Sequence, residues 1–141
     1  MKNTWHVNGN YFTRELASVH INLFMKKIIF YSPDFTLNLS LLMYLQPSYN
    51  ITMTTDIEDL KAICSSFSCD LILLDAPPSD DIEALCQDLK LVKSQTPIIM
   101  FYVFDNKFKA FDQNIRKYVT SVFYKPFDLE NVTQQLSLLT R

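Results

Sequence analysis

The feature that most constrains this chain is a strict alternation, from Lys26 to the C-terminus, of short apolar runs with segments whose apolar residues recur at helical spacing. A short apolar or β-branched run fits a buried strand, whereas apolar residues three and four apart fit one face of a helix. The predicted strands are 27–31, 50–54, 71–74, 98–103 and 119–124, and the predicted helices are 35–45, 56–64, 82–92, 106–117 and 128–139.

This alternation predicts an α/β fold in which a doubly wound, five-stranded parallel sheet has helices on both faces. Each connection between parallel strands needs a covering helix, which explains why strand and helix must alternate along the chain. A sheet of this kind has its functional crevice at the carboxyl ends of the strands, near the reversal in strand order. The residues that directly follow each strand are therefore the candidates for function.

Length and composition exclude several other classes. The 141 residues suffice for one ordinary domain, and 48% hydrophobic residues fit a folded core rather than a disordered chain. A net charge of -2, with scattered basic residues, argues against nucleic acid as a direct partner. The longest apolar runs are far shorter than a membrane span, so no membrane partner is expected.

Two scarce residue types remove most enzyme chemistry. The only histidines are His6 and His20, and the only glycine is Gly9, so the body of the chain lacks imidazole and a glycine-rich phosphate loop. We therefore expect no enzymatic activity. The cysteines are odd in number and lack C-x-x-C spacing, which predicts reduced thiols in a cytoplasmic protein. We interpret them as helix-packing residues, with a redox role as the alternative: Cys64, Cys69 and Cys86.

The residues that directly follow three of the predicted strands include a hydroxyl, two acids and a lysine. They are Ser32, Pro33 and Asp34 after the first strand, Asp75 after the third, and Lys125 after the fifth. Because these strand ends meet at one edge of a parallel sheet, two acids and a lysine there could hold a cation or a phosphoryl group. The alternative is that each aspartate caps the helix that follows it.

Four segments resemble, in this order, the response-regulator receiver domain (CheY-like) family. The resemblance covers the chain from Lys26 onward, so we expect residues 26–141 to form a receiver-like domain. It implies a flavodoxin-like sheet with the strand order 2-1-3-4-5. The segments are KKIIFYSPD at 26–34, DLILLD at 70–75, PIIM at 97–100 and KPFDLE at 125–130.

The resemblance also implies roles for individual residues. Asp75 falls on the family's phosphorylated aspartate, and Lys125 on the lysine that contacts the phosphoryl oxygens. The carbonyl of Pro77 falls where the family uses a backbone oxygen as a metal ligand. The bond between Lys125 and Pro126 resembles one that the family holds in cis, a state that essentially only proline makes accessible.

The sequence departs from the family where the metal binds. Receivers carry two acids immediately after the first strand, one of which binds Mg²⁺ directly, and here these positions are Ser32 and Pro33. Mg²⁺ depends on carboxylates to offset its dehydration, so the metal site is predicted to be weak or absent. Asp34, one residue later, is the candidate substitute ligand beside Asp75 and Pro77. The expected cofactor is accordingly none, or weakly bound Mg²⁺.

The pair of switch positions that the resemblance implies is also changed. The small hydroxyl residue at the end of the family's fourth strand is Tyr102 here, and the aromatic residue three before Lys125 is Val122. A bulky ring at position 102 could fill the space and lock one state. The alternative is that a large and a small residue have been exchanged and the core repacks around them.

Two apolar surfaces are candidates for protein contacts. Residues 1–25 lie outside the resemblance and are predicted to form an N-terminal extension with a short amphipathic helix. Phe108 and Phe111, with lysines beside them, predict a partly exposed aromatic interaction surface on the fourth helix, unless both rings turn inward against the sheet. The face of the N-terminal helix would consist of Phe12, Leu16, Val19 and Leu23.

The leading hypothesis is an atypical receiver, a signalling module with impaired Mg²⁺-dependent phosphorylation that acts by binding other proteins. One alternative is a working phosphoacceptor, phosphorylated on Asp75 by a histidine kinase or a phosphotransfer protein. A minor alternative is a flavodoxin-like cofactor binder that uses residues 32–36 as its phosphate loop. The expected partner is a signalling protein such as a histidine kinase, or a second copy in a homodimer.

Overall fold

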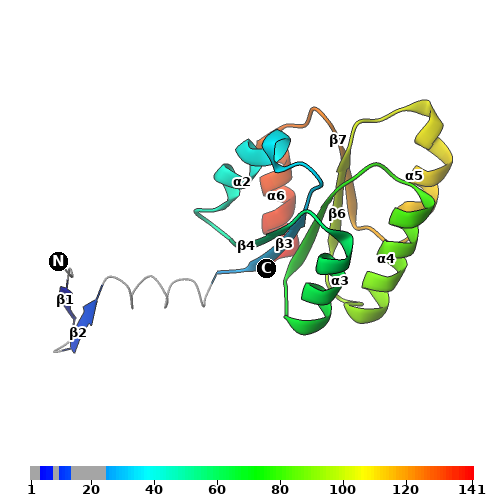
Figure 1. Cartoon of the computed structure of the whole chain (residues 1–141). Helices are drawn as coiled ribbons and strands as arrows, with labels where there is room; N and C mark the ends of the chain where they lie inside the picture. Colours follow the sequence, from blue (N-terminus) through cyan, green and yellow to red (C-terminus); the bar gives the residue numbers. More distant parts are fainter. Residues whose placement is uncertain (1–3, 8–9, 14–24) are drawn as a thin grey trace.

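The computed structural model describes residues 4–7, 10–13 and 25–141, and its main feature is a five-stranded parallel sheet (Figure 1). The strand order is β4-β3-β5-β6-β7, which is 2-1-3-4-5 when these five strands are numbered along the chain. The predicted fold class is therefore confirmed. The strands are β3 (Lys27–Tyr31), β4 (Asn50–Thr54), β5 (Leu71–Asp75), β6 (Ile98–Tyr102) and β7 (Ser121–Tyr124).

Helices cover both faces of this sheet. In Figure 1, α2 and α6 lie on one side of the strands, and α3, α4 and α5 lie on the other. No helix among the described residues is long and apolar enough to cross a membrane. The helices are α2 (Leu39–Leu45), α3 (Ile57–Ser66), α4 (Asp80–Val92), α5 (Lys109–Ile115) and α6 (Leu129–Leu139).

The alternation of side chains along each strand divides the core in two. In β5, Leu71 and Leu73 pack with α2 and α6, whereas Ile72 and Leu74 pack against α3, α4 and α5. Every residue of β5 and β6 is buried, as expected for central strands with helices on both faces. Asp75 is the one ionisable carboxylate in these two strands.

Side-chain caps set several helix boundaries. Asp56 accepts a hydrogen bond from the Asp59 amide and begins α3, as predicted, while Asp128 accepts one from the Glu130 amide and begins α6. The predicted helices 35–45 and 106–117 each begin with a 3₁₀ turn. These turns are η1 (Phe35–Asn38) and η2 (Asn106–Phe108).

The N-terminal segment differs from the prediction. Strands β1 (Thr4–Val7) and β2 (Asn10–Thr13) pair antiparallel, and Phe12 lies in β2, so the predicted helix is wrong at this residue. Aromatic and β-branched residues favour a strand, and the Asn8-Gly9 pair in this sequence is a strong hairpin signal that outweighs the helical spacing. The rest of the predicted face lies outside the described residues: Leu16, Val19 and Leu23.

Candidate functional site

Asp75 is the centre of the site, because it ends the central strand β5. Its neighbours β3 and β6 run parallel to it, so the residues that follow these strands meet at the same edge of the sheet. Only 8% of the Asp75 surface is exposed. A carboxylate this deep needs partners for both of its oxygens, because an unpaired buried charge is costly.

Asp75 has such partners from two other strand ends. Lys125, which follows β7, forms an ion pair with Oδ1 through its Nζ atom. Ser32, which follows β3, donates from Oγ to Oδ2 over 2.8 Å. The Lys125 amide also donates to the Tyr102 carbonyl over 2.9 Å, and the bond to Pro126 is cis. Three strand ends thus converge on one carboxylate.

Ser32 is fully buried and held from two sides. Its amide donates to the Thr54 carbonyl over 3.1 Å, which fixes the backbone against β4. Its hydroxyl lies 3.1 Å from the Asp34 carbonyl oxygen as well as against Asp75, so its single proton is shared between these acceptors. Where the resemblance predicts an acid that would repel Asp75, the chain has a hydroxyl that donates to it.

The carboxylate of Asp34 has a local role. Its Oδ1 accepts a hydrogen bond from the Thr36 amide over 2.9 Å and caps η1, and the residue is exposed. Pro77 is exposed on the loop between β5 and α4. Whether Asp34, Asp75 and Pro77 bind a metal ion together stays a prediction.

The donors present fit a Mg²⁺ site poorly. Among the described residues, no three side chains of aspartate, glutamate, histidine or cysteine form a cluster that could hold a metal ion. Asp75, the buried carboxylate at these strand ends, already binds Lys125 and Ser32. Mg²⁺ requires near-octahedral oxygen ligands with carboxylates among them, so it would have to displace Lys125 or Ser32 to bind an oxygen of Asp75.

Tyr102, at one of the two predicted switch positions, is engaged away from Asp75. Its ring is 2% exposed, and its hydroxyl donates to Oδ1 of Asp112 on α5. The same Oδ1 accepts from the Tyr124 hydroxyl over 3.1 Å, and Oδ2 accepts from Nε of Arg116 over 2.9 Å. Arg116 also donates to the Tyr124 hydroxyl over 3.0 Å. We call these four side chains the Asp112 network.

The protonation states in the Asp112 network follow from its contacts. Burial alone would raise the pKa of Asp112, but hydrogen bonds from Tyr102, Arg116 and Tyr124 outweigh it and hold this pKa below its usual range. Burial first, and then the hydrogen bond to Asp112, raise the pKa of Tyr102 far above that of a free tyrosine. At neutral pH Tyr102 is therefore a neutral donor in this network, Asp112 a carboxylate and Arg116 a guanidinium.

The predicted aromatic surface is only partly exposed. Phe108 and Phe111 are both half-buried, and the Phe108 ring packs edge-on against Tyr102 at 5.9 Å between centroids. Val122, the other switch position, packs beside the same core. The larger exposed apolar surfaces nearby belong to Val103, at 63%, and Phe104, at 43%. Whether any of these residues contacts a partner stays a prediction.

Two parts of this site were missed in the sequence. One is the hydrogen bond from Ser32 to Asp75, because a serine at this position indicates by itself only that an acid is absent. The other is the Asp112 network, for which the spacing of Asp112 and Arg116, four apart on a predicted helix, was an available signal.

Comparison with protein-family models and with curated protein sequences gives no match. Solved structures do match. A redox sensor of the streptococci, from a family that evolved from two-component response regulators, has a TM-score of 0.71 and 20% identity over 82% of this chain. The match covers 51% of that protein, so the chain spans about half its length.

The receiver domain of the sensor histidine kinase PA1611 from Pseudomonas aeruginosa, with magnesium coordinated in its active-site cleft, matches with a TM-score of 0.69 and 16% identity. This match covers 82% of this chain and 98% of that one. An adenylate cyclase from Rhodopirellula baltica matches with a TM-score of 0.70 and 14% identity, over 82% and 87% of the two chains.

Several further neighbours are response regulators or their receiver domains. At these identities the likeness shows the fold, which is that of receiver domains. One neighbour bears the name of an enzyme, so the expected absence of enzymatic activity stays a prediction.

Proposed function

We propose that this chain is a two-component-type signalling module whose Asp75 crevice is held by protein groups instead of a metal ion, and which acts through protein contacts. The observation that carries this proposal is the hydrogen bond from Ser32 to Asp75, at the position where the resemblance predicts a metal-binding acid. Phosphorylation of Asp75 would then be weak and nearly independent of Mg²⁺.

The argument rests on competition for the oxygens of Asp75. Lys125 and Ser32 each bind one of them, so a metal ion or an incoming phosphoryl group must displace at least one partner. A hydrogen bond to a charged group contributes about 1.5–3 kcal/mol, and a metal that gains a single carboxylate recovers little of this cost. The resting arrangement is therefore favoured.

The Asp112 network supports a preformed contact surface. In an ordinary receiver the fourth strand ends in a small hydroxyl residue, which the family uses in switching. Here Tyr102 joins β6 to α5 through Asp112, and Tyr124 joins β7 to the same carboxylate. Because this contact does not involve Asp75, we expect the surface of α5 and β7 to keep one conformation whether or not Asp75 is phosphorylated.

The partner that we propose is a signalling protein, such as a histidine kinase, or a second copy of this chain. The half-buried Phe108 and Phe111, with exposed Lys107 and Lys109 beside them, would form part of that contact. A cytoplasmic location stays a prediction from the reduced cysteines and the composition.

Labelling with a small phosphodonor tests the proposal. The full chain is incubated with acetyl phosphate with and without Mg²⁺, and phosphoryl addition is measured by intact mass. We expect weak labelling of the wild type that Mg²⁺ barely changes, and Mg²⁺-dependent labelling of a variant carrying Ser32→Asp with Pro33→Asp. Asp75→Asn in either background is the control and should remove the signal.

A second measurement keeps the proposal testable if the double variant does not fold. Amide shifts around Asp75 in the wild type are followed during a Mg²⁺ titration, and we expect no saturation in the low millimolar range. Strong, Mg²⁺-dependent labelling of wild-type Asp75, or saturation at low millimolar Mg²⁺, would overturn the proposal.

Those results would instead support a working phosphoacceptor. The direct ion pair between Asp75 and Lys125 keeps this function as a second candidate.

The flavodoxin-like alternative is disfavoured by the loop that follows β3. Ser32 is committed to Asp75, and the carboxylates of Asp34 and Asp75 beside the loop would repel a cofactor phosphate.

A further inference from the structure

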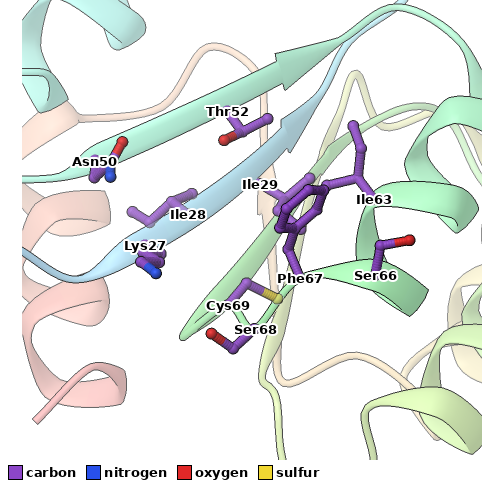
Figure 2. Close-up of a pocket in the computed structure, with 10 residues that line it drawn as sticks. All are labelled: Lys27, Ile28, Ile29, Asn50, Thr52, Ile63, Ser66, Phe67, Ser68 and Cys69. Carbon is purple, nitrogen blue, oxygen red and sulfur yellow. The ribbon is translucent and has the colours of Figure 1, made fainter. Parts of the chain in front are cut away.

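A groove lies at the opposite end of the sheet from Asp75 (Figure 2). It has a volume of about 450 Å³ and is formed by the first residues of β3, the edge strand β4, and the segment that follows α3. Lys27 is at one end of it, Phe67 lies over it with 66% of its surface exposed, and Cys69 forms part of its wall. The Cys69 thiol is therefore open to small molecules.

A second thiol contacts Cys69 from inside the core. Cys64, on the last turn of α3, is fully buried, and Cys69 packs against the core cluster that contains it, near enough for the two thiols to shift each other's pKa. The Thr96 hydroxyl and the Lys93 ammonium are near enough to Cys69 to act on the charge of its sulfur. An accessible thiol is thus paired with an inaccessible one.

The surroundings of Cys69 favour its thiolate. The hydrogen bond from Cys64 lowers the pKa of Cys69 most, and the charge of Lys93 and the Thr96 hydroxyl lower it further. Burial and the carboxylate of Asp70 oppose them, but the net direction is down. The same hydrogen bond and burial raise the pKa of Cys64, which keeps its proton. The Cys69 sulfur can therefore act as a nucleophile, and the Cys64 thiol can donate a proton to it.

We propose that Cys69 is an oxidation site for small hydroperoxides such as hydrogen peroxide, and that Cys64 then closes an intramolecular disulfide with it. This proposal stands apart from the proposed function at Asp75, because it uses neither the Asp75 crevice nor the Asp112 network.

The chemistry balances in two steps. The Cys69 thiolate attacks one peroxide oxygen, so that an S–O bond forms and the O–O bond breaks. The departing hydroxide takes up a proton and leaves as water, and Cys69 becomes a sulfenic acid. The Cys64 thiol then loses its proton as its sulfur attacks Cys69, which forms the S–S bond and breaks the S–O bond. The hydroxide that departs takes this proton, so one peroxide yields one disulfide and two waters.

Closing this bridge would change the wall of the groove. The Phe67 amide caps α3 by donating to the Ile63 carbonyl over 2.9 Å, and Asp70 accepts from the Lys27 amide over 2.8 Å. Cys69 lies between these two fixed points. We therefore expect oxidation to rearrange residues 67–70 locally, at the mouth of the groove.

The test exposes the reduced full chain to hydrogen peroxide and maps its peptides by mass spectrometry without reduction. We expect a Cys64–Cys69 disulfide, with Cys86 left as a free thiol because it is fully buried. In Cys64→Ala, dimedone should trap Cys69 as the sulfenic acid, and in Cys69→Ser neither product should form. Cys86→Ser is the matched control and should behave as the wild type.

A rate measurement on the folded protein supplements the peptide map and needs no cysteine substitution. Alkylation of Cys69 by iodoacetamide is followed against pH, and its midpoint should lie below the value of about 8.5 for a free cysteine. Lys93→Gln should raise that midpoint, whereas Lys117→Gln, an exposed lysine on another element, should not. A wild-type map without the Cys64–Cys69 bridge, or a Cys69 midpoint at or above that of free cysteine, would overturn the proposal.

Discussion

Replacing Tyr102 with phenylalanine tests whether the Asp112 network joins α5 to the sheet. The substitution removes one hydroxyl and leaves the ring, which packs edge-on against Phe108 at 5.9 Å and Tyr124 at 5.4 Å. Any change in stability therefore reports on the hydrogen bond to Asp112 rather than on packing. The bond is buried and its acceptor is charged, which is the strongest class of neutral-donor hydrogen bond.

The expected loss of stability in Tyr102→Phe depends on the hydrogen bonds that Asp112 keeps. Hydrogen bonds to charged groups contribute about 1.5–3 kcal/mol, and the full penalty applies when the acceptor is left without a partner. Asp112 keeps Arg116 and Tyr124 in the variant, so we expect the low end of that range, about 1.5 kcal/mol.

Urea denaturation followed by circular dichroism measures this change. The matched control is Tyr118→Phe, because its hydroxyl accepts from Gln87 over 2.9 Å at an exposed site and should cost less than about 0.5 kcal/mol. If Tyr102→Phe and Tyr118→Phe lower the free energy of unfolding equally, the network does not anchor α5. A change in the denaturant slope rather than the midpoint would also count against the reasoning, since it would indicate an altered denatured or native ensemble.

Two further predictions concern charged groups. Lys125→Ala should lower the free energy of unfolding by about 1–3 kcal/mol, because it removes the ammonium that pairs with the buried Asp75 carboxylate, whereas Lys117→Ala, at an exposed position, should be nearly neutral in the same urea assay. Because the pKa of Asp112 is depressed in the folded state, its contribution is present above the unfolded value of about 3.9 and is lost as the pH falls through the folded value. The loss of stability between pH 6 and pH 3 should thus be smaller in Asp112→Asn than in the wild type, and equal losses would contradict this assignment.

The sequence predicts most of the sheet because the strands are buried on both faces. A run such as Leu71 to Leu74 has few alternatives to a central parallel strand, and the ends of such strands must meet. That geometry alone predicts that Asp75 and Lys125 lie close together, as they do. It does not predict that Ser32 donates to Asp75, because this depends on a side-chain rotamer and on the loop after β3.

The Asp112 network was not predicted for a different reason. Asp112 and Arg116, four residues apart, are typical of a solvent-exposed ion pair on a helix, and nothing local distinguishes a buried pair from an exposed one. Its burial depends on Tyr102 and Tyr124, which come from two other elements, β6 and β7. The N-terminal error has a different origin, because apolar residues at helical spacing through Phe12 predict a helix whereas the Asn8-Gly9 pair favours a hairpin.

The charges around Asp75 explain why the substitutions at positions 32 and 33 belong together. As it stands, the crevice pairs one carboxylate with one ammonium, and a neutral hydroxyl satisfies the second oxygen. Acids at the buried position 32 and the exposed position 33 would add two negative charges beside Asp75, and a divalent cation is the group that offsets them. Losing only one acid would leave a single unbalanced charge that Mg²⁺ overcompensates and Lys125 alone cannot neutralise. Ser32 and Pro33 carry no charge, so Lys125 offsets the charge of Asp75 without a metal ion.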